Sequence, residues 1–247
     1  MLSIADTVTS IAQPGVESRP SPQRASPPSL LHSYTPECVP VIAEMLNITT
    51  GILDKILETR TIENVMGREG MNMLGVNYRT SPVVLDEFSH AERVNAYRAL
   101  EEGVLVAGDR APDAPGLILA ASGAETRLFD VFSPTYHTVI VFSPDVASSM
   151  DVLEASRKYP GDVIRSMIVL PQGSEATTVT RADVVVDQGG HAYRGYLAMK
   201  GEKKVIVVRP DGVVGAIVHG TEGVEAYFSR VFISSVVSFL CVRRVVT

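Results

Sequence analysis

The stretch KVIVVRPDGVVGAIV, residues 204–218, decides the fold class of this chain. Two runs rich in β-branched residues, Lys204–Arg209 and Val213–Val218, flank the tripeptide Pro210-Asp211-Gly212. Proline presets a turn-compatible φ and glycine accepts a positive φ, so this tripeptide is typical of a tight turn. The sequence therefore predicts an antiparallel β-hairpin here.

Two further apolar strands precede the hairpin. His137–Phe142 (HTVIVF) and Ile164–Leu170 are continuous apolar runs, which are typical of strands in a sheet covered on both faces. Val146–Tyr159 lies between them, has helical apolar spacing and is closed by Pro160-Gly161. The order strand, helix, strand predicts a parallel βαβ unit.

The remaining elements complete a recognisable order. Ala182–Asp187 predicts a third short strand, and a break at Gly189-Gly190 precedes a short helix around His191–Met199. Thr221–Val231 predicts a final helix with apolar residues on one face. A βαβ unit followed by a helix, a hairpin and a last helix is the order of the thioredoxin fold. We therefore predict an α/β, thioredoxin-like domain with a mixed sheet covered by helices on both faces.

Thiol chemistry is excluded from this domain by its sequence. A working thioredoxin needs a low-pKa cysteine, usually in CxxC, where the first strand meets its helix. Residues 143–148 hold that place with the sequence SPDVAS, which has no cysteine. The two cysteines of the chain, Cys38 and Cys241, lie near opposite ends, so they form neither a CxxC pair nor a cysteine-rich zinc site.

No other catalytic signature stands out, and we assign no catalytic, cofactor-binding or metal-ligating residue. The chain has no GxGxxG, P-loop, HExxH or GxSxG string. Gly108-Asp109 resembles a flavin-contacting Gly-Asp pair, but the prolines that follow favour a connection. Tyr193, Arg194 and Tyr196 form a polar-aromatic cluster for which packing or an interface outweighs catalysis. The histidines are not paired at metal-ligand spacing; they are His32, His90, His137, His191 and His219.

Composition limits the classes of partner. The chain has 247 residues, 45% of them hydrophobic and 20% charged, as expected for a globular protein. Its net charge is −6 and its pI about 5.4, so it lacks the basic excess that supplies non-specific nucleic-acid affinity. No signal peptide is recognisable, and the apolar run 231–242 is too short for a bilayer. We expect a cytoplasmic protein with no nucleic-acid or membrane partner.

The N-terminal part combines a Pro/Ser-rich lead with an apolar helix. Residues 1–30 cannot bury enough surface to offset their ordering entropy, so we expect disorder there. A helix is predicted over Pro36–Leu57, with Thr35 as its N-cap and Gly51 as an interruption. Its apolar face has little neighbouring sequence to pack against. Leu74–Tyr78 predicts a short extended piece.

Several ordered strings resemble the C-terminal part of phenol hydroxylase-type (phenol 2-monooxygenase-like) flavin monooxygenases. They span about Leu30 to Phe232 and include LLHSYTPECVPVIAEMLNITT (30–50), LGVNYRTSPVVLDE (74–87), AGDRAPDAPGL (107–117), LFDVFSPTYHTVIVF (128–142) and the hairpin with the helix after it. The resemblance implies a flavin domain and a substrate domain, followed by a thioredoxin-like domain without redox cysteines that contributes to dimerisation. It also implies FAD and NADPH as the family's cofactors.

The resemblance divides the chain into five segments. Residues 1–30 are the lead, 31–60 resemble the last helix of the flavin domain, and 61–105 connect it to the thioredoxin-like dimerisation domain 106–233, before a divergent tail, 234–247. The helix matches the family pattern at Tyr34, Glu37 and Pro40, but Cys38 stands where the family usually has arginine. The family's flavin-binding motifs do not precede it, which is the pattern of a truncated relative or an incomplete gene model.

Two hypotheses follow from this resemblance. The first is a non-catalytic homodimerisation module that binds no cofactor and is inactive as an enzyme on its own. The alternative is a part in FAD- and NADPH-dependent hydroxylation of phenolic aromatics, with the flavin domain missing from this chain or supplied by a separate chain. A scaffold for an unrelated protein is a third possibility, with no motif behind it.

Overall fold

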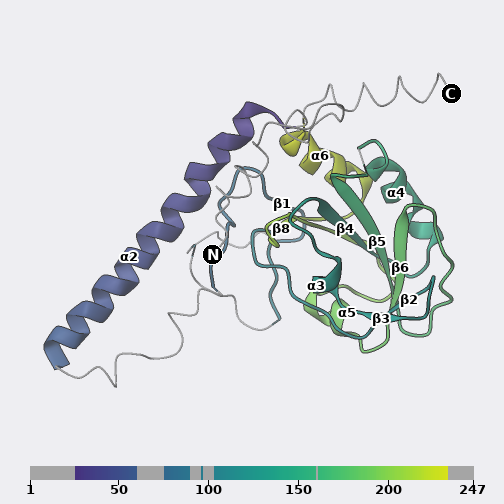
Figure 1. The fold of residues 1–247 in the computed structure, drawn as a ribbon, viewed down its shortest axis with the longest axis horizontal. Helices are drawn as coiled ribbons and strands as arrows, with labels where there is room; N and C mark the ends of the chain where they lie inside the picture. The colour runs from purple at the N-terminus through teal and green to yellow at the C-terminus, as the bar shows by residue number, and fades with distance from the viewer. Residues whose placement is uncertain (1–25, 60–74, 90–95, 97–102, 160, 233–247) are drawn as a thin grey trace, which may run out of the picture.

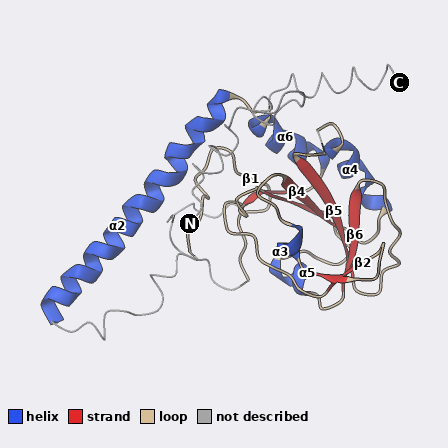
Figure 2. Cartoon of the chain, viewed as in Figure 1, coloured by secondary structure: helices blue, strands red, loops and turns tan. Residues whose placement is uncertain are grey.

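The structure is a computed structural model that describes residues 26–59, 75–89, 96, 103–159 and 161–232. A long helix lies beside a compact α/β domain (Figures 1 and 2). The helical elements are η2 (Pro28–Ser33), α2 (Tyr34–Thr59), α3 (Leu128–Val131), η3 (Ala147–Ser149), α4 (Met150–Ser156), α5 (His191–Gly195) and α6 (Thr221–Val231). The strands are β1 (Leu85–Asp86), β2 (Leu117–Leu119), β3 (Glu125–Thr126), β4 (His137–Phe142), β5 (Ile164–Pro171), β6 (Ala182–Asp187), β7 (Lys204–Val208) and β8 (Val214–Val218).

The eight strands form one mixed sheet in the order β1-β8-β7-β4-β5-β6-β2-β3. β4 and β5 are parallel neighbours joined through α4, and β7 and β8 form an antiparallel hairpin against β4. The order β5-β4-β7-β8, with α6 after it, is that of the thioredoxin fold. The predicted α/β fold class is therefore confirmed.

The hairpin closes through the turn that its sequence predicts. Gly212 has a φ of +79°, a conformation that side chains disfavour. Its N–H donates to the Arg209 carbonyl at 3.0 Å, and the Arg209 N–H donates to the Val213 carbonyl at 2.8 Å. Beyond the turn, Val205 pairs with Val218 and Ile206 with Ile217. The turn thus aligns the apolar residues of both strands.

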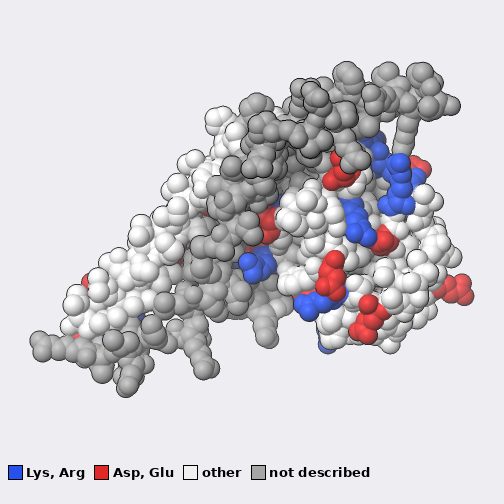
Figure 3. Space-filling view, viewed as in Figure 1, with Lys and Arg blue, Asp and Glu red and all other residues white. Residues whose placement is uncertain are grey.

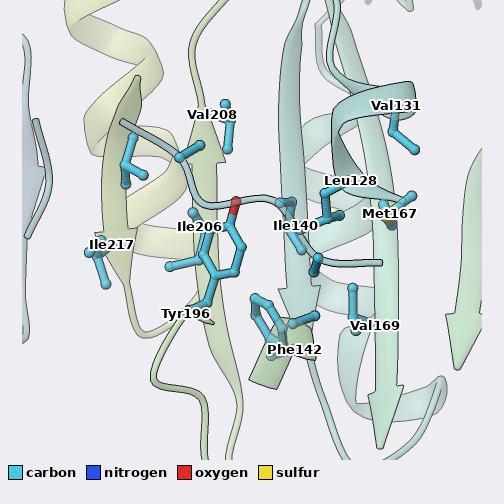
Figure 4. Packing of buried hydrophobic residues seen from close by; sticks show 14 of the residues in the cluster. Leu128, Val131, Ile140, Phe142, Met167, Val169, Tyr196, Ile206, Val208 and Ile217 are labelled. Carbon is cyan, nitrogen blue, oxygen red and sulfur yellow. The ribbon is translucent and has the colours of Figure 1, made fainter. Parts of the chain in front are cut away.

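Side-chain alternation along the strands builds a core on each face of the sheet. Val139 and Val141 of β4 pack against the side covered by α4 and α6, whereas Ile140 and Phe142 face α3 and α5. Figure 4 shows the cluster on the side of α3 and α5, in which the ring of Phe142 lies beside that of Tyr196 over the face of the sheet. The continuous apolar strands are explained by this two-sided burial.

The structure corrects several predicted boundaries. The helix predicted over Val146–Tyr159 is divided into η3 and the seven-residue α4, and the helix predicted over His191–Met199 is the five-residue α5. No strand lies over residues 75–78 of the piece predicted as extended. The short strands β1, β2 and β3 and helix α3 were not predicted, because elements of two to four residues carry no periodicity.

Helix α2 differs from its prediction at its start and at its middle. It runs without a break for 26 residues through Gly51, because one internal glycine costs a helix only ~1 kcal/mol. The 3-10 helix η2 leads directly into it, so Thr35 lies inside the helix and is not its N-cap. Of the predicted disordered lead, residues 26–30 are described and η2 already begins at Pro28. Residues 1–25 and the tail 234–247 lie outside the described residues.

Candidate functional site

The place where thioredoxin-fold enzymes carry their cysteines is a tightly hydrogen-bonded turn. The Ser143 hydroxyl donates to the Asp145 carbonyl at 2.8 Å, and the Ser148 N–H donates to the Asp145 carboxylate at 2.7 Å. Hydrogen bonds from Ser148 hold the pKa of this exposed carboxyl below its usual range. These hydrogen bonds hold the turn from which the helical segment after β4 begins, so the polar groups of Ser143 and Asp145 already have partners within the turn.

The carboxyl ends of the central strands are closed by Tyr193. Its hydroxyl donates to the Ser143 carbonyl and to the Val169 carbonyl, both at 3.1 Å. Its ring lies edge-on against Phe142, with ring centroids 5.2 Å apart. Burial raises the pKa of this phenol far above its ordinary value, so it stays a neutral donor. The side chain of Tyr193 thus fills the space at the strand ends, where enzymes with the thioredoxin fold carry their reactive cysteines.

Asp187 fastens the same end of the sheet to α5. Its fully buried carboxylate accepts the N–H groups of His191 at 3.1 Å and Tyr193 at 3.0 Å. Arg194, on the outer side of this turn, donates to the carbonyls of Gly189 and Gly190. The Asp187 carboxylate therefore has a structural role as acceptor for backbone N–H groups, as expected because a buried carboxylate needs hydrogen-bond partners.

The predicted Tyr193, Arg194 and Tyr196 cluster divides into two packing residues and one surface residue. Tyr196 is fully buried, and its hydroxyl donates to the Pro112 carbonyl at 2.7 Å. Arg194 is exposed. Both tyrosines therefore pack, which is one of the roles that the sequence favours for this cluster.

A shallow hollow of about 660 Å³ lies beside α5. Lys204, a buried residue of β7, shapes its rim by donating to the carbonyls of Tyr196 at 2.9 Å and Leu197 at 3.2 Å. Leu197 has a φ of +50°, which this lysine helps to hold. The hollow is lined by Gln172, Asp187, Gly189, Gly190, Tyr193, Arg194, Leu197, Ala198, Met199 and Lys200. Because the Asp187 carboxylate and the Tyr193 hydroxyl are engaged within the fold, this lining brings together no acid–base pair.

The Gly108-Asp109 pair has a structural role. Gly108 has a φ of +103°, and a Cβ there would lie 2.5 Å from the backbone of Arg79, so the position requires glycine. The Arg79 Nε donates to the Asp109 carboxylate at 2.6 Å, and the Val106 N–H donates to the same carboxylate at 2.9 Å. The pair thus ties the segment before β1 to the segment before β2.

A second polar network attaches α2 to the domain, and we call it the Glu37 anchor (Glu37, Ser81, Arg209 and Asp211). Glu37 is 2% exposed and accepts both terminal nitrogens of Arg209, at 2.8 and 3.2 Å. The Ser81 hydroxyl also donates to Glu37, at 2.5 Å. Arg209 contacts Asp211 at 2.8 Å as well. A forked, hydrogen-bonded pair of this kind is a geometrically specific contact.

The surroundings of the Glu37 anchor keep Arg209 charged. Burial alone would lower the pKa of Arg209, but the carboxylates of Asp211 and Glu37 raise it above its ordinary value. The guanidinium also lies over the Tyr78 ring, 5.8 Å from its centroid. The sequence singles out Glu37 as an acidic residue in the first turn of a helix and through the resemblance, but it does not reveal Arg209 as its partner. The one local signal for Arg209 is its position as a charged residue between the apolar run 204–208 and the turn that follows.

Beyond this anchor, α2 exposes large apolar side chains along most of its length. Figure 3 shows this helix almost free of charged atoms on the visible face. The exposed apolar residues of η2 and α2 are Leu31, Tyr34, Val39, Ile42, Met45, Leu46, Leu53 and Leu57. Val41, Ile48, Ile52 and Ile56 are half-buried on another side. A helix that is apolar on several sides is typical of one buried in the core of a large protein.

The described residues hold no group of three histidine, cysteine, aspartate or glutamate side chains that could bind a metal ion. Within the same residues, no helix has both the length and the apolar character to cross a membrane.

No protein-family model matches the sequence. A flavin-dependent monooxygenase of Mycobacteroides abscessus is 25% identical over 207 residues, which are 83% of this chain and 32% of that protein. The chain therefore spans about a third of the length of this curated relative. The similarity relates the chain to flavin-dependent monooxygenases.

Two solved structures share the fold. Aklavinone-11 hydroxylase, in a complex with FAD and aklavinone, has a TM-score of 0.58 and 19% identity over 84% of this chain and 36% of its own. The flavin-dependent monooxygenase PieE, in complex with FAD and substrate, has a TM-score of 0.55 and 14% identity over 83% of this chain and 41% of its own.

The two glycine-bearing turns from strand to helix in the described residues do not fit a dinucleotide. A pyrophosphate needs free N–H groups at such a helix start. At α5, the buried Asp187 carboxylate already accepts these groups. At α6, Glu87 accepts the His219 N–H at 2.8 Å, and a Cβ on Gly223 would lie 2.7 Å from the same carboxylate. Both positions present negative charge where an anion would bind.

Proposed function

We propose that this chain is a non-catalytic, thioredoxin-like module of a phenol hydroxylase-type flavin monooxygenase, and that it acts by self-association as a homodimer. The similarity to a flavin-dependent monooxygenase supports the parent class. The proposed module is residues 106–233, and the helix within 31–60 provides its association surface. We further propose a cytoplasmic location, with no nucleic-acid or membrane partner.

The observation that carries the association is the apolar, largely uncovered surface of α2. Ile42 is 51% exposed and Leu53 55% exposed, whereas the ion-paired contact between helix and domain lies near the first turn, at Glu37. Monomeric proteins rarely expose contiguous apolar patches of more than a few hundred Å². A partner surface that covers α2 removes this apolar area from water and stabilises the assembly.

The closed strand ends support the non-catalytic part of the proposal. The turn after β4 uses its polar groups to start a helix, and Tyr193 fills the space beside it. A catalytic site on this fold would need an accessible nucleophile at that edge. The fold thus supplies rigidity and surface, which are what an association module requires.

Light scattering of the purified chain after size exclusion tests the proposal. At tens of micromolar we expect the mass of a dimer, and dilution should convert it to monomer with a measurable dissociation constant. A monomer throughout this range contradicts self-association.

A second candidate function is participation in FAD- and NADPH-dependent hydroxylation of phenolic aromatics. Similarity over 83% of the chain to a flavin-dependent monooxygenase favours it. The flavin domain would then lie on another chain or on a longer form of this one, because the described glycine turns do not fit FAD.

The visible absorption spectrum of the chain, purified after expression with ample flavin, separates the two candidates. A colourless protein supports the module, and a near-stoichiometric flavin band supports the enzyme. Addition of a separate flavin-domain chain gives a second test: hydroxylation above that of the flavin domain alone supports participation, and no gain contradicts it.

A further inference from the structure

We infer that the Glu37 anchor is a reversible contact with two states, one in which α2 is attached to the domain and one in which it is released. In the attached state, which the structure shows, Glu37 pairs with Arg209. In the released state, Glu37 is in water and Asp211 alone neutralises Arg209. Both states belong to a single chain, so the contact is independent of the proposed self-association.

The carboxylate of Glu37 receives its hydrogen bonds from the domain. Its three side-chain donors are the two terminal nitrogens of Arg209, at 2.8 and 3.2 Å, and the Ser81 hydroxyl, at 2.5 Å. None of these donors belongs to α2. Release of the helix therefore breaks no side-chain hydrogen bond within α2, and the freed carboxylate is hydrated, which offsets part of the lost contact.

Arg209 keeps a carboxylate partner when Glu37 leaves. Its second terminal nitrogen lies 2.8 Å from the carboxylate of Asp211. Asp211 belongs to the same turn, which is closed by the bond from the Gly212 N–H to the Arg209 carbonyl at 3.0 Å, so it stays beside Arg209 wherever α2 lies. Breaking a buried ion pair is costly when it leaves an uncompensated charge. Here the charge left in the domain remains compensated.

The segment around Ser81 is also held without α2. The Val83 N–H donates to the Ser81 hydroxyl oxygen at 3.2 Å, and the Ser81 N–H donates to the Tyr78 carbonyl at 2.9 Å. Arg230 of α6 donates to the Val84 carbonyl at 2.9 Å, which fixes the same segment on the domain. Only the Ser81 hydroxyl exchanges its carboxylate acceptor for water. The domain side of the anchor is therefore arranged for both states.

Glu37 and Asp211 compete for one guanidinium. Both carboxylates contact the same terminal nitrogen of Arg209, Glu37 at 3.2 Å and Asp211 at 2.8 Å. Two like charges at one nitrogen repel each other. Asp211 therefore weakens the attached state and stabilises the released one. This opposite action of the two acidic residues separates a reversible contact from a network in which every member adds stability.

The part of α2 that follows the anchor adds little to the attachment. Val39 and Ile42, two and five residues after Glu37, are 55% and 51% exposed. In Figure 1 the helix passes along one side of the domain, and its C-terminal end lies away from the sheet. Little apolar area near the anchor therefore opposes release, and both states are populated in solution.

Single-molecule energy transfer on the full chain tests this inference. Cys38→Ser and Cys241→Ser provide the background, and dyes are attached at Glu58→Cys, near the end of α2, and at Glu175→Cys, on the domain. Both positions are exposed. Picomolar protein keeps the chain monomeric, so a failure of self-association does not affect the result. We expect two populations with different transfer efficiencies, and their ratio measures the attachment.

Substitutions of the two acidic residues should change this ratio in opposite directions. Glu37→Gln should lower the ratio of attached to released chains roughly tenfold or more, because charge-assisted hydrogen bonds are lost. Asp211→Asn should raise it roughly threefold or more, because the repulsion and the alternative partner are removed. Asparagine keeps the side-chain oxygen that accepts the Val213 N–H. The matched control is Asp183→Asn, which breaks an exposed pair with Arg165 and should leave the ratio unchanged.

Three results would overturn the reversible contact. A single population in the background chain excludes the second state. A ratio that Glu37→Gln leaves unchanged means that α2 is held elsewhere. A ratio that stays the same or falls with Asp211→Asn means that Asp211 supports the attachment. Circular dichroism checks that each variant is folded, and Asp211→Ser, which is also neutral and retains a side-chain oxygen, replaces Asp211→Asn if that variant is not.

Discussion

Helix α2 and the α/β domain are both rich in apolar residues, yet the domain buries its own and the helix does not. Phe142 of β4 is fully buried between the rings of Tyr193 and Tyr196, whereas Leu46 and Leu53 of α2 are more than half exposed. The same hydrophobic character therefore stabilises the chain in one region and creates an unfilled surface in the other. The difference teaches that apolar character alone does not decide burial: the domain packs its apolar residues against one another, whereas the described residues leave those of α2 exposed.

A core truncation should give the largest effect and should be independent of protein concentration. Phe142→Ala removes a fully buried ring, so we expect the free energy of unfolding to fall by about 3–5 kcal/mol. Urea denaturation at two protein concentrations measures it. A loss below about 1 kcal/mol would mean that the core between β4 and α5 is not closely packed.

Removal of the arginine that joins the two regions should be the next largest effect. Arg209→Ala leaves the buried Glu37 carboxylate without its partner, which costs about 3 kcal/mol of anchoring free energy. Hydrogen exchange should become faster at the start of α2 while β4 and β5 stay protected. The matched control is Arg165→Ala, which breaks an exposed pair with Asp183 and should cost below about 1 kcal/mol.

Acid should weaken the domain through one histidine. His137 lies against the rings of Tyr227, Phe228 and Phe232, and burial, together with the charge of Arg209, lowers its pKa from 6.5 to about 3. Between these two pKa values the unfolded chain binds a proton at His137 that the folded chain does not bind. The contribution of neutral His137 to the free energy of unfolding is therefore fully present above pH 6.5 and is lost as the pH falls toward 3.

The expected slope from His137 is at most ~1.4 kcal/mol per pH unit within that window. Chemical denaturation between pH 7 and pH 4 measures it, and a stable His137→Phe variant should show a shallower dependence. If the two chains lose stability in parallel, the imidazole titrates normally in the fold.

The hydroxyl of Tyr193 should contribute a smaller amount. Tyr193→Phe leaves the Ser143 and Val169 carbonyls without this donor, so we expect the free energy of unfolding to fall by about 1 kcal/mol. The dimer dissociation constant should not change, because this hydroxyl is buried in the other region. A change in association would mean that the closed strand ends communicate with the interface.

The smallest effect is expected on α2 itself at low concentration. Leu53→Ala removes a side chain that is 55% exposed, so in dilute protein the free energy of unfolding should change by less than about 0.5 kcal/mol. As the concentration rises into the dimer range, the deficit should grow, because association stabilises only the folded chain. A deficit that does not depend on concentration would place Leu53 in the monomer's own packing.

The parts of the fold that the sequence predicts well are those with repeated local signals. Thr221–Val231 and Ala182–Asp187 have the predicted bounds, because each is an apolar run with a glycine at one end, Gly220 before the helix and Gly189 after the strand. The strands β2 and β3 escape prediction, since three and two residues cannot display a period. They are held by pairing across the sheet, which is long-range information.

The anchor is the part of the candidate site that no local pattern reveals. Glu37 and Arg209 are separated by 172 positions, and neither lies in a motif whose spacing implies the other. By contrast, the unpartnered face of α2 follows directly from its apolar spacing and its polar neighbours in sequence. Apolar periodicity thus predicts which face of a helix must be covered, whereas the ion pair that attaches α2 to the domain is seen only in the three-dimensional structure.

Attachment of α2 near one end makes the helix a lever. A tilt of about 10° at Glu37 displaces the far end by about 6 Å, given ~1.5 Å of rise per residue from Glu37 to Thr59. The fulcrum is Arg209, which adjoins the tight β7–β8 turn rather than a core side chain. Substitutions around this turn can therefore change the direction of α2 relative to the domain without repacking the sheet. The orientation of the helix can thus evolve independently of the stability of the domain.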